Sequence, residues 1–273
     1  MKFVKPFNRM QSDLHVHTNL SFCAPHSTLP ESYLPYCGEE NISVIGFSNH
    51  IYAPHALAGR KMPEKRGADY ALRLRSRLNG LQETTSVRLL LGAETELVCG
   101  QEPTLSYEEA KQFDYVLLAA SHIMNLPGEY KDFDLSTPDK LRELTLSQFY
   151  HACSLDYPVP AGICHPLYPI CSPWEQEVVD GITDSQLSDA FAAAARKGLS
   201  IEIHACLYRN GTARDADGLS PSYLRVLSAA KASGCKFHFG SDAHAPGAFC
   251  GVHRLLRLAA ERAGITEEDL WEL

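Results

Sequence analysis

Potential metal ligands stand at or near the carboxyl end of nearly every predicted β-strand in this chain. A first strand over residues 12–16 runs into the segment DLHVHT, which carries His15 and His17. Later predicted strands end at further ligand side chains, namely His50, Glu94, His122, His165, Asp242 and His244. Parallel strands of a closed α/β barrel direct their carboxyl ends to one face. We therefore expect these imidazoles and carboxylates to converge on one pocket and to bind several metal ions there.

Strand and helix patterns alternate seven times, which favours a parallel sheet. The expected strands span 12–16, 43–48, 87–93, 115–120, 159–164, 199–204 and 236–241. The expected helices span 31–40, 64–82, 106–112, a segment from 137 onwards, 184–197, 220–233 and 252–263. Ser106 with Glu109, and Thr183 with Gln186, have the spacing of capping boxes at two helix starts. The segments 52–66, 125–136 and 166–182 are expected to be long loops around the mouth of the pocket.

The length and charge of the chain limit its class and its partners. A chain of 273 residues fits one α/β domain over 1–273. Its net charge of -8 argues against a nucleic-acid partner, because a phosphate backbone would be repelled. A small phosphorylated substrate stays compatible, since metal ions and an arginine can offset its charge locally.

Cysteine usage and hydropathy indicate a compartment. Nine cysteines without a CxxC pair favour free thiols in a reducing environment. The amino terminus has no apolar signal segment, and no run of about 18 apolar residues exists to cross a membrane. We therefore expect a cytoplasmic protein without a membrane partner, while the sequence leaves the oligomeric state open.

His15 and His17 are two positions apart, so a strand points both imidazoles to the same side. Such a pair also occurs without a metal ion. Asp13 and Thr18 beside the pair strengthen the metal interpretation, because neighbouring polar groups orient ligating histidines.

Taken in order, these motifs resemble those of the polymerase and histidinol phosphatase (PHP) family. DLHVHT near the amino terminus, Gly92-Ala93-Glu94, the pair ending at His122, His165-Pro166 and GSDAH near the carboxyl terminus follow the family's order over nearly the whole chain. The resemblance implies an α/β fold with a single distorted (β/α)7 TIM-like barrel. It implies a metal site at the C-terminal ends of the strands that holds three divalent metal ions. Mixed imidazole and carboxylate ligands suit Zn, Fe or Mn.

The family pattern also implies which side chains share each ion. The ligands implied for the first ion are His15, His17, Glu94 and Asp242. Those implied for the second are Glu94, His122 and His165, so that Glu94 bridges the two ions.

The third ion would be held by His50, His244 and one further side chain. The stretch NLSFCAPHS resembles the segment FCPHG of the histidinol-phosphate phosphatase branch, with Cys23 and His26 slightly further apart. On that match the remaining ligand maps best to His26, and Cys23 is the competing residue.

The sequence predicts fewer residues for substrate contact than for metal binding. The segment EIHACLYRNG resembles EINTSGLRK of the same branch, which implies that Arg209 grips the substrate phosphate with its planar fork. His55 is a further candidate for substrate contact. Two residues depart from the family, because Asn49 stands where an acid is usual and His204 stands where Asn is usual. His204 either hydrogen-bonds substrate or water, or packs as a polar residue.

These features predict a metal-dependent phosphatase for a small phosphate monoester, with L-histidinol phosphate of histidine biosynthesis as the leading substrate. In this chemistry a metal-bridging hydroxide attacks phosphorus, and the candidate catalytic groups are Arg209, Asp242 and His244. A nucleotide phosphatase or phosphodiesterase, and an amidohydrolase-type enzyme that cleaves a C–N bond on a similar barrel, are the alternatives. A binding module without activity would be expected to lack ligands, whereas all nine implied positions are filled here.

Overall fold

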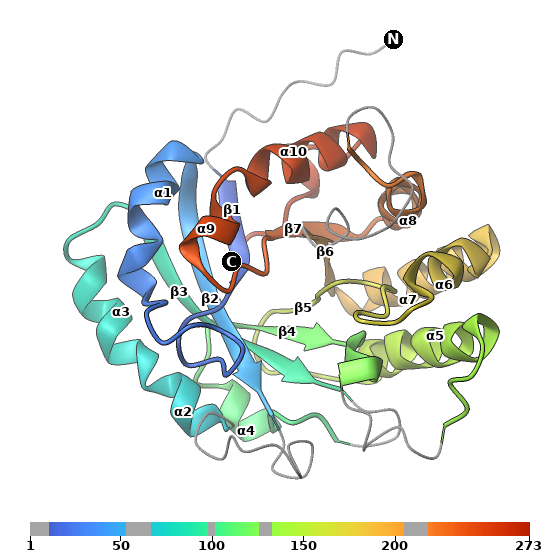
Figure 1. Ribbon diagram of the computed structural model, residues 1–273, viewed down its shortest axis with the longest axis horizontal. Coiled ribbons are helices and arrows are strands. Elements are labelled where there is room, and N and C mark those ends of the chain that lie inside the picture. Colours follow the sequence, from blue (N-terminus) through green and yellow to red (C-terminus); the bar gives the residue numbers. More distant parts are fainter. Residues whose placement is uncertain (1–10, 53–66, 98–101, 126–132, 205–217) are drawn as a thin grey trace.

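Seven parallel strands form one sheet that curves into a nearly closed barrel (Figure 1). The computed structural model describes residues 11–52, 67–97, 102–125, 133–204 and 218–273. Each strand pairs in parallel with the next one along the chain. The strands are β1 (Gln11–Val16), β2 (Ile42–Ile51), β3 (Arg88–Glu96), β4 (Tyr115–Ala119), β5 (Ala161–Ile163), β6 (Ser200–His204) and β7 (Lys236–Gly240). The predicted (β/α)7 TIM-like barrel is confirmed.

The barrel closes where the chain that follows β7 meets β1. The backbone N–H of Asp242 donates to the His15 carbonyl over 2.7 Å, and the N–H of His17 donates to the Ala243 carbonyl over 2.9 Å. Val16 and Ala243 form an isolated parallel bridge beside them. These backbone bonds hold three of the expected metal ligands next to one another, although they come from opposite ends of the chain.

Helices cover the outside of the barrel (Figure 1). They are α1 (Leu34–Glu39), α2 (Ala68–Leu72), α3 (Leu74–Gln82), α4 (Tyr107–Ala110), α5 (Pro138–Ser154), α6 (Glu175–Gly181), α7 (Asp184–Lys197), α8 (Pro221–Ala232), α9 (Pro246–Phe249) and α10 (Val252–Arg262). Short 3-10 turns occur at η1 (Pro30–Ser32), η2 (His122–Asn125) and η4 (Glu267–Asp269). Within the described segments, no helix has the length and hydropathy needed to cross a bilayer.

Local capping explains where the helices begin. Ser106 and Glu109 form a capping box at α4, and Thr183 and Gln186 form one at α7, as the sequence predicted. Each box satisfies two backbone N–H groups that have no partner inside the helix. At the other end of α7, Gly198 adopts the left-handed conformation that ends helices.

Four predicted elements, two strands, a helix and a loop, differ from the structure. Backbone pairing between β2 and β3 continues through His50 and Glu94, so these two residues lie inside longer strands rather than at strand ends. The helix expected over 64–82 is divided into α2 and α3 at Arg73, and its first residues lie outside the described segments. The loop expected over 166–182 contains α6, which forms because Val178 and Val179 are buried there.

Tyr115 at the start of β4 fills the interior of the barrel. Its side chain is fully buried, and its hydroxyl donates to the Leu14 carbonyl over 2.5 Å. A Cβ atom added at Gly46 or Gly92 would lie 2.1 or 2.2 Å from atoms of this side chain, so both positions require glycine. The amino-terminal half of β4 thus belongs to an apolar core, while the residues that follow the strand are polar.

Candidate metal centre

Glu94 lies at the centre of a cluster of buried ligand atoms. Its Oε2 atom is 3.5 Å from both His15 Nε2 and His17 Nε2. Asp242 Oδ1 joins this group at 2.9 Å from His17 Nε2 and 3.5 Å from His15 Nε2. Among the described residues, none of these four atoms has a partner with hydrogen-bonding geometry. Buried polar atoms normally have such partners, so this group fits a divalent cation with four ligands.

The other carboxylate oxygen of Glu94 faces a second group. Oε1 lies 2.9 Å from His165 Nε2 and 3.7 Å from His122 Nε2. The two imidazole rings stack with their centroids 4.8 Å apart. Glu94 therefore has one oxygen in each of two adjacent groups of ligand atoms, which is the arrangement of a bridging carboxylate.

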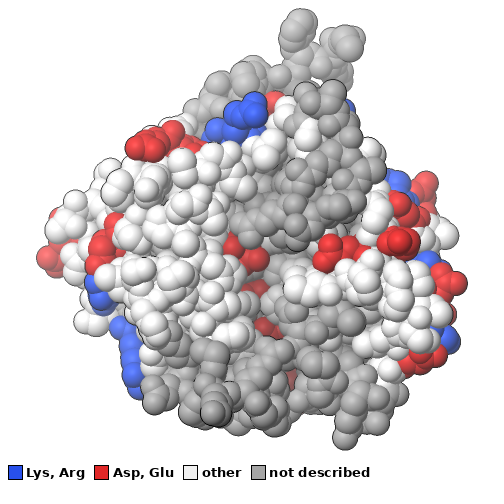
Figure 2. All heavy atoms as spheres, in the orientation of Figure 1, with Lys and Arg blue, Asp and Glu red and all other residues white. Residues whose placement is uncertain are grey.

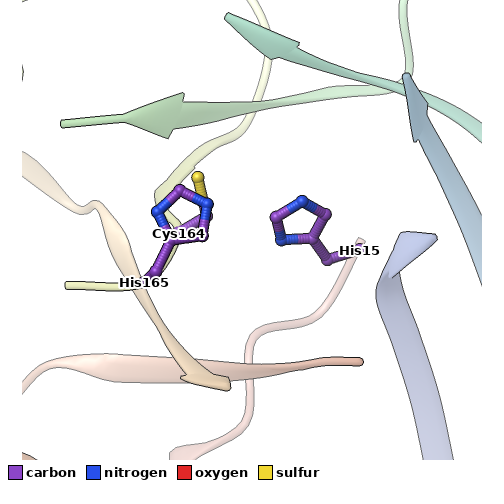
Figure 3. A group of neighbouring side chains, drawn as sticks. All are labelled: His15, Cys164 and His165. Carbon is purple, nitrogen blue, oxygen red and sulfur yellow. The ribbon is translucent and has the colours of Figure 1, made fainter. Parts of the chain in front are cut away.

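Figure 3 shows how segments far apart in the sequence meet in this cluster. His15 extends from β1 and His165 from the segment after β5, and their rings lie across a short gap with centroids 5.5 Å apart. Cys164 lies next to His165, and its thiol donates to Glu94 Oε1 over 3.6 Å. The sequence assigned no role to this cysteine.

Three imidazoles form a third group at the edge of the cluster. The ring of His17 lies between those of His50 and His244, with centroid distances of 4.4 and 4.1 Å. His50 Nδ1 is 2.5 Å from Glu94 Oε2. His244 Nε2 is 2.9 Å from Cys23 Sγ, whereas the side chain of His26 is exposed. The structure thus brings Cys23, rather than His26, to these histidines.

Oxygen atoms orient most of the histidines through Nδ1. These contacts join His15 to Glu202 at 2.6 Å, His17 to Ser21 at 2.9 Å, His122 to Glu96 at 2.8 Å, His165 to Ser121, and His244 to the Asp242 carbonyl at 2.9 Å. A neutral imidazole that donates from Nδ1 keeps its lone pair on Nε2. In its neutral form, each of these five imidazoles can therefore offer Nε2 to a cation.

Glu202 and Glu96 contact candidate ligands of the cluster, although the sequence analysis named neither. Glu202 is fully buried and contacts two ligand residues, because its Oε1 accepts from His15 and its Oε2 accepts from the backbone N–H of His165 over 2.6 Å. His204 Nδ1 lies 3.1 Å from the same carboxylate. The pattern LSIEIH contained a signal, since strand alternation places Glu202 on the same face as His204.

Asp13, a polar residue of the first strand, acts on the backbone. Asp13 Oδ1 accepts from the N–H groups of His15 and Ser241 over 3.2 and 3.1 Å, and Oδ2 lies 2.7 Å from His253 Nε2. Asp13 therefore joins β1 to the end of β7 and does not orient an imidazole of the cluster. This contact also gives His253 on α10 a structural role.

Asn49 takes the place of the usual acid and forms part of a polar network. Its Oδ1 atom accepts from the Thr18 N–H over 2.8 Å and from Ser21 Oγ over 2.9 Å. Because Ser21 Oγ also contacts His17 Nδ1, Asn49 positions a ligand side chain through one intermediate residue. Thr18, expected to support the histidine pair, acts through this network.

Buried acids and imidazoles balance one another in the cluster. Burial opposes the charged form of Glu94, but the histidines at 50, 15 and 122 outweigh it and hold the pKa of Glu94 well below its usual value. Burial likewise opposes protonation of His15, yet Glu202 and Glu94 raise the pKa of His15 well above its usual value. Figure 2 shows acidic side chains in the hollow at the middle of the drawn face, with described lysines and arginines toward its edges.

Two ligand residues have a strained backbone. Asp242 has a φ of 51° and His165 a φ of 34°, which lie in the left-handed region. Non-glycine residues in sparsely populated regions cost about 1–3 kcal/mol each and gather at functional sites. The strain allows both side chains to turn into the pocket directly after their strands.

Arg209 and His55, the other expected substrate contacts, lie outside the described residues. His204 is fully buried, and its Nε2 atom is 4.0 Å from Asp242 Oδ2.

The fold is shared with solved structures, although no protein-family model and no curated protein matches the sequence. One similar structure is histidinol phosphate phosphatase (HisK) from Lactococcus lactis, complexed with zinc, L-histidinol and phosphate. It has 15% identity and a TM-score of 0.65, and the match covers 94% of each chain. HisK from Listeria monocytogenes, provisionally assigned as a histidinol phosphatase, has 12% identity and a TM-score of 0.65 over 90% of this chain and 99% of that chain.

These two likenesses extend over nearly the whole barrel. At such low identity they establish the fold, which is the one that the PHP resemblance implied. The activity must be inferred from the chemistry of the site.

Metal uptake is expected to release protons. Burial opposes protonation of His15 and His50, but Glu202 and Glu94 raise the pKa of His15, and Glu94 raises the pKa of His50. A cation must displace those protons, so apparent affinity should rise as the pH increases above about 6.5, the ordinary histidine value. Calorimetric titration with zinc in two buffers of different ionisation enthalpy measures the release. Identical heats in both buffers would contradict it.

Proposed function

We propose that residues 1–273 form a single-domain, metal-dependent hydrolase of a small phosphate monoester. One observation carries the proposal: the two oxygens of Glu94 face two separate groups of buried ligand atoms. Paired metal sites of this kind are used to displace groups at phosphorus.

The cofactors of this proposal are three divalent ions, drawn from Zn, Fe and Mn. Buried ligand atoms without hydrogen-bonding partners and a mixed nitrogen and oxygen donor set fit such ions. When bound, the ions would lower the pKa of a water nucleophile and offset charge on the phosphoryl oxygens. The chain itself holds the ligands in place through Glu202, Glu96 and Ser21.

Asp242 and His244 are the proposed catalytic groups, because they are more accessible than the rest of the cluster. Their side chains are 17% and 29% exposed, whereas those of His15 and His17 are fully buried. A substrate would therefore meet Asp242 and His244 first, and we propose that this pair assists the transfer of a proton to the leaving oxygen. His204 Nε2, near Asp242 Oδ2, is proposed to hydrogen-bond substrate or water.

L-histidinol phosphate is the proposed substrate. The segments around Cys23 and Arg209 resemble the histidinol-phosphate phosphatase branch, and the similar Lactococcus structure is described with zinc, L-histidinol and phosphate. A role in histidine biosynthesis in the cytoplasm follows from that substrate. The free cysteines of the described residues are compatible with a reducing compartment.

Phosphate release by protein loaded with Zn, Mn or Fe tests the function. The panel contains histidinol phosphate, other small monoesters, nucleotides and a diester. Rapid turnover of one monoester supports the proposal and identifies the substrate. If only the diester is cleaved, a phosphodiesterase replaces it. If no phosphate compound reacts while metal is bound, hydrolysis of a C–N bond becomes the better-supported hypothesis.

Replacing Arg209 by Ala is expected to raise KM for the monoester. A hydrogen bond to a charged group contributes about 1.5–3 kcal/mol, so kcat/KM should fall roughly 10- to 100-fold. Steady-state kinetics measures the change, and the metal content should stay at the wild-type value. An unchanged KM would remove Arg209 from the phosphate pocket and favour the amidohydrolase alternative.

A further inference from the structure

The loop that follows β1 is fixed beside the third group of histidines. The N–H of Asn19 donates to the Thr28 carbonyl over 2.7 Å, which closes the loop at its base. The Thr28 hydroxyl donates to the His244 carbonyl over 3.2 Å. The backbone of the loop is therefore joined directly to one of the residues that form the group.

Within this loop, Cys23 is the residue that faces the histidines. Its Sγ atom lies 2.9 Å from His244 Nε2, and the ring of His244 lies beside that of His50, with centroids 5.9 Å apart. Because His244 Nδ1 contacts the Asp242 carbonyl, Nε2 is the nitrogen that remains for a cation. The sulfur is thus in direct contact with His244, next to His50 of the same group.

His17 is already used by the neighbouring site. Its Nε2 atom faces Asp242 Oδ1 at 2.9 Å and its Nδ1 atom contacts Ser21 Oγ at 2.9 Å. It cannot also direct a lone pair to a cation between His50 and His244. That position therefore needs a ligand from outside the barrel strands.

His26 lies in a different turn of the same loop. The N–H of Thr28 donates to the Pro25 carbonyl over 3.0 Å, and this turn carries an exposed His26 side chain. For His26 to reach the cluster, this turn would have to open, whereas Cys23 is already in contact.

We propose that Cys23 Sγ is the third protein ligand of the third cation, together with His50 and His244. The inference rests on the metal centre of the proposed function and changes its ligand set at one position. Zinc binds sulfur at about 2.3 Å and imidazole at about 2.0–2.1 Å, which separates tetrahedral ligands by roughly 3.5 Å. A modest opening of the observed contact therefore admits the ion. A thiolate ligand also makes this site selective for zinc or cobalt over manganese.

Cobalt(II) loading tests the ligand directly, because thiolate coordination gives an intense near-ultraviolet charge-transfer band. We expect the band in the wild-type chain and its loss in Cys23→Ser, with one ion fewer per chain. Cys250→Ser is the matched control, since Cys250 is also exposed, and it should keep both the band and the ion. His26→Ala should keep both as well. If the band survives in Cys23→Ser, or if His26→Ala loses the ion, the proposal is overturned.

Alkylation of the wild-type chain gives a readout that needs no variant. Bound zinc should protect Cys23 from iodoacetamide at least tenfold while Cys250 is still modified, as measured by peptide mass spectrometry. Equal labelling of Cys23 with and without zinc would overturn the assignment. These readouts do not involve turnover. A chain that shows the band and the protection but releases no phosphate would retain the Cys23 ligand and lose the proposed phosphatase function.

Discussion

Replacing Glu94 by Gln should lower phosphate release by at least about 10³-fold. The carboxylate contributes one oxygen to each of two ligand groups, and a glutamine amide nitrogen cannot replace either oxygen as a metal ligand. Metal ions at such sites stabilise the transition state by several kcal/mol, and each 1.36 kcal/mol corresponds to a factor of ten in rate. The variant should also bind fewer ions per chain.

The matched control for this variant is Glu143→Gln on α5. Its side chain is 71% exposed and pairs with Lys140 at the surface, so its loss should change neither metal content nor turnover. Metal content by elemental analysis and phosphate release under saturating substrate separate the two variants. If Glu94→Gln retained full metal content and near wild-type turnover, the bridged centre would be wrong.

The strand ends that carry the ligands could be predicted because two simple regularities coincide there. Alternation puts His15 and His17 on one side of β1, and a parallel barrel gathers the carboxyl ends of its strands. The positions of His50 and Glu94 were predicted less well, since β2 and β3 continue beyond them. That error did not affect the site, because inward-facing residues near the top of a barrel strand still point into the pocket.

The conformation of the loop after β1 and the residues that support the ligands could not be predicted from strand alternation and barrel geometry. Whether Cys23 or His26 faces His50 depends on two successive turns between Ser21 and Thr28, and turn geometry is not contained in residue spacing. The role of Glu202 in orienting the ligands could in principle have been predicted from the sequence. An acid at an inward-facing strand position must be paired when it is buried, so its place two residues before His204 predicts a buried partner.

Replacing Glu202 by Gln is expected to weaken metal binding more than the loss of an ordinary supporting contact. Glu202 accepts from the His15 ring, which belongs to the first group, and from the His165 backbone, which belongs to the second. A Gln side chain has one acceptor oxygen, so it can keep only one of these two contacts. Loss of a partner that orients a ligand costs about 10- to 100-fold in metal affinity or activity.

Because the two groups share Glu94 and Glu202 contacts a residue of each, the substitution should weaken the binding of both ions. We expect the affinity for metal to fall roughly 10²- to 10⁴-fold. Glu96→Gln is the comparison, because Glu96 hydrogen-bonds the His122 ring of the second group, while its other contact, 3.6 Å to His50 Nδ1, is longer than a hydrogen bond, so this variant should give about 10- to 100-fold. Competition for zinc against a chromogenic chelator measures the affinity of both variants.

Gly240→Ala is expected to weaken metal binding in the same way, since its Cβ would lie 1.9 Å from Glu202 Oε1 and displace the carboxylate. Equal losses in Glu202→Gln and Glu96→Gln would mean that Glu202 supports one ion and does not connect the two.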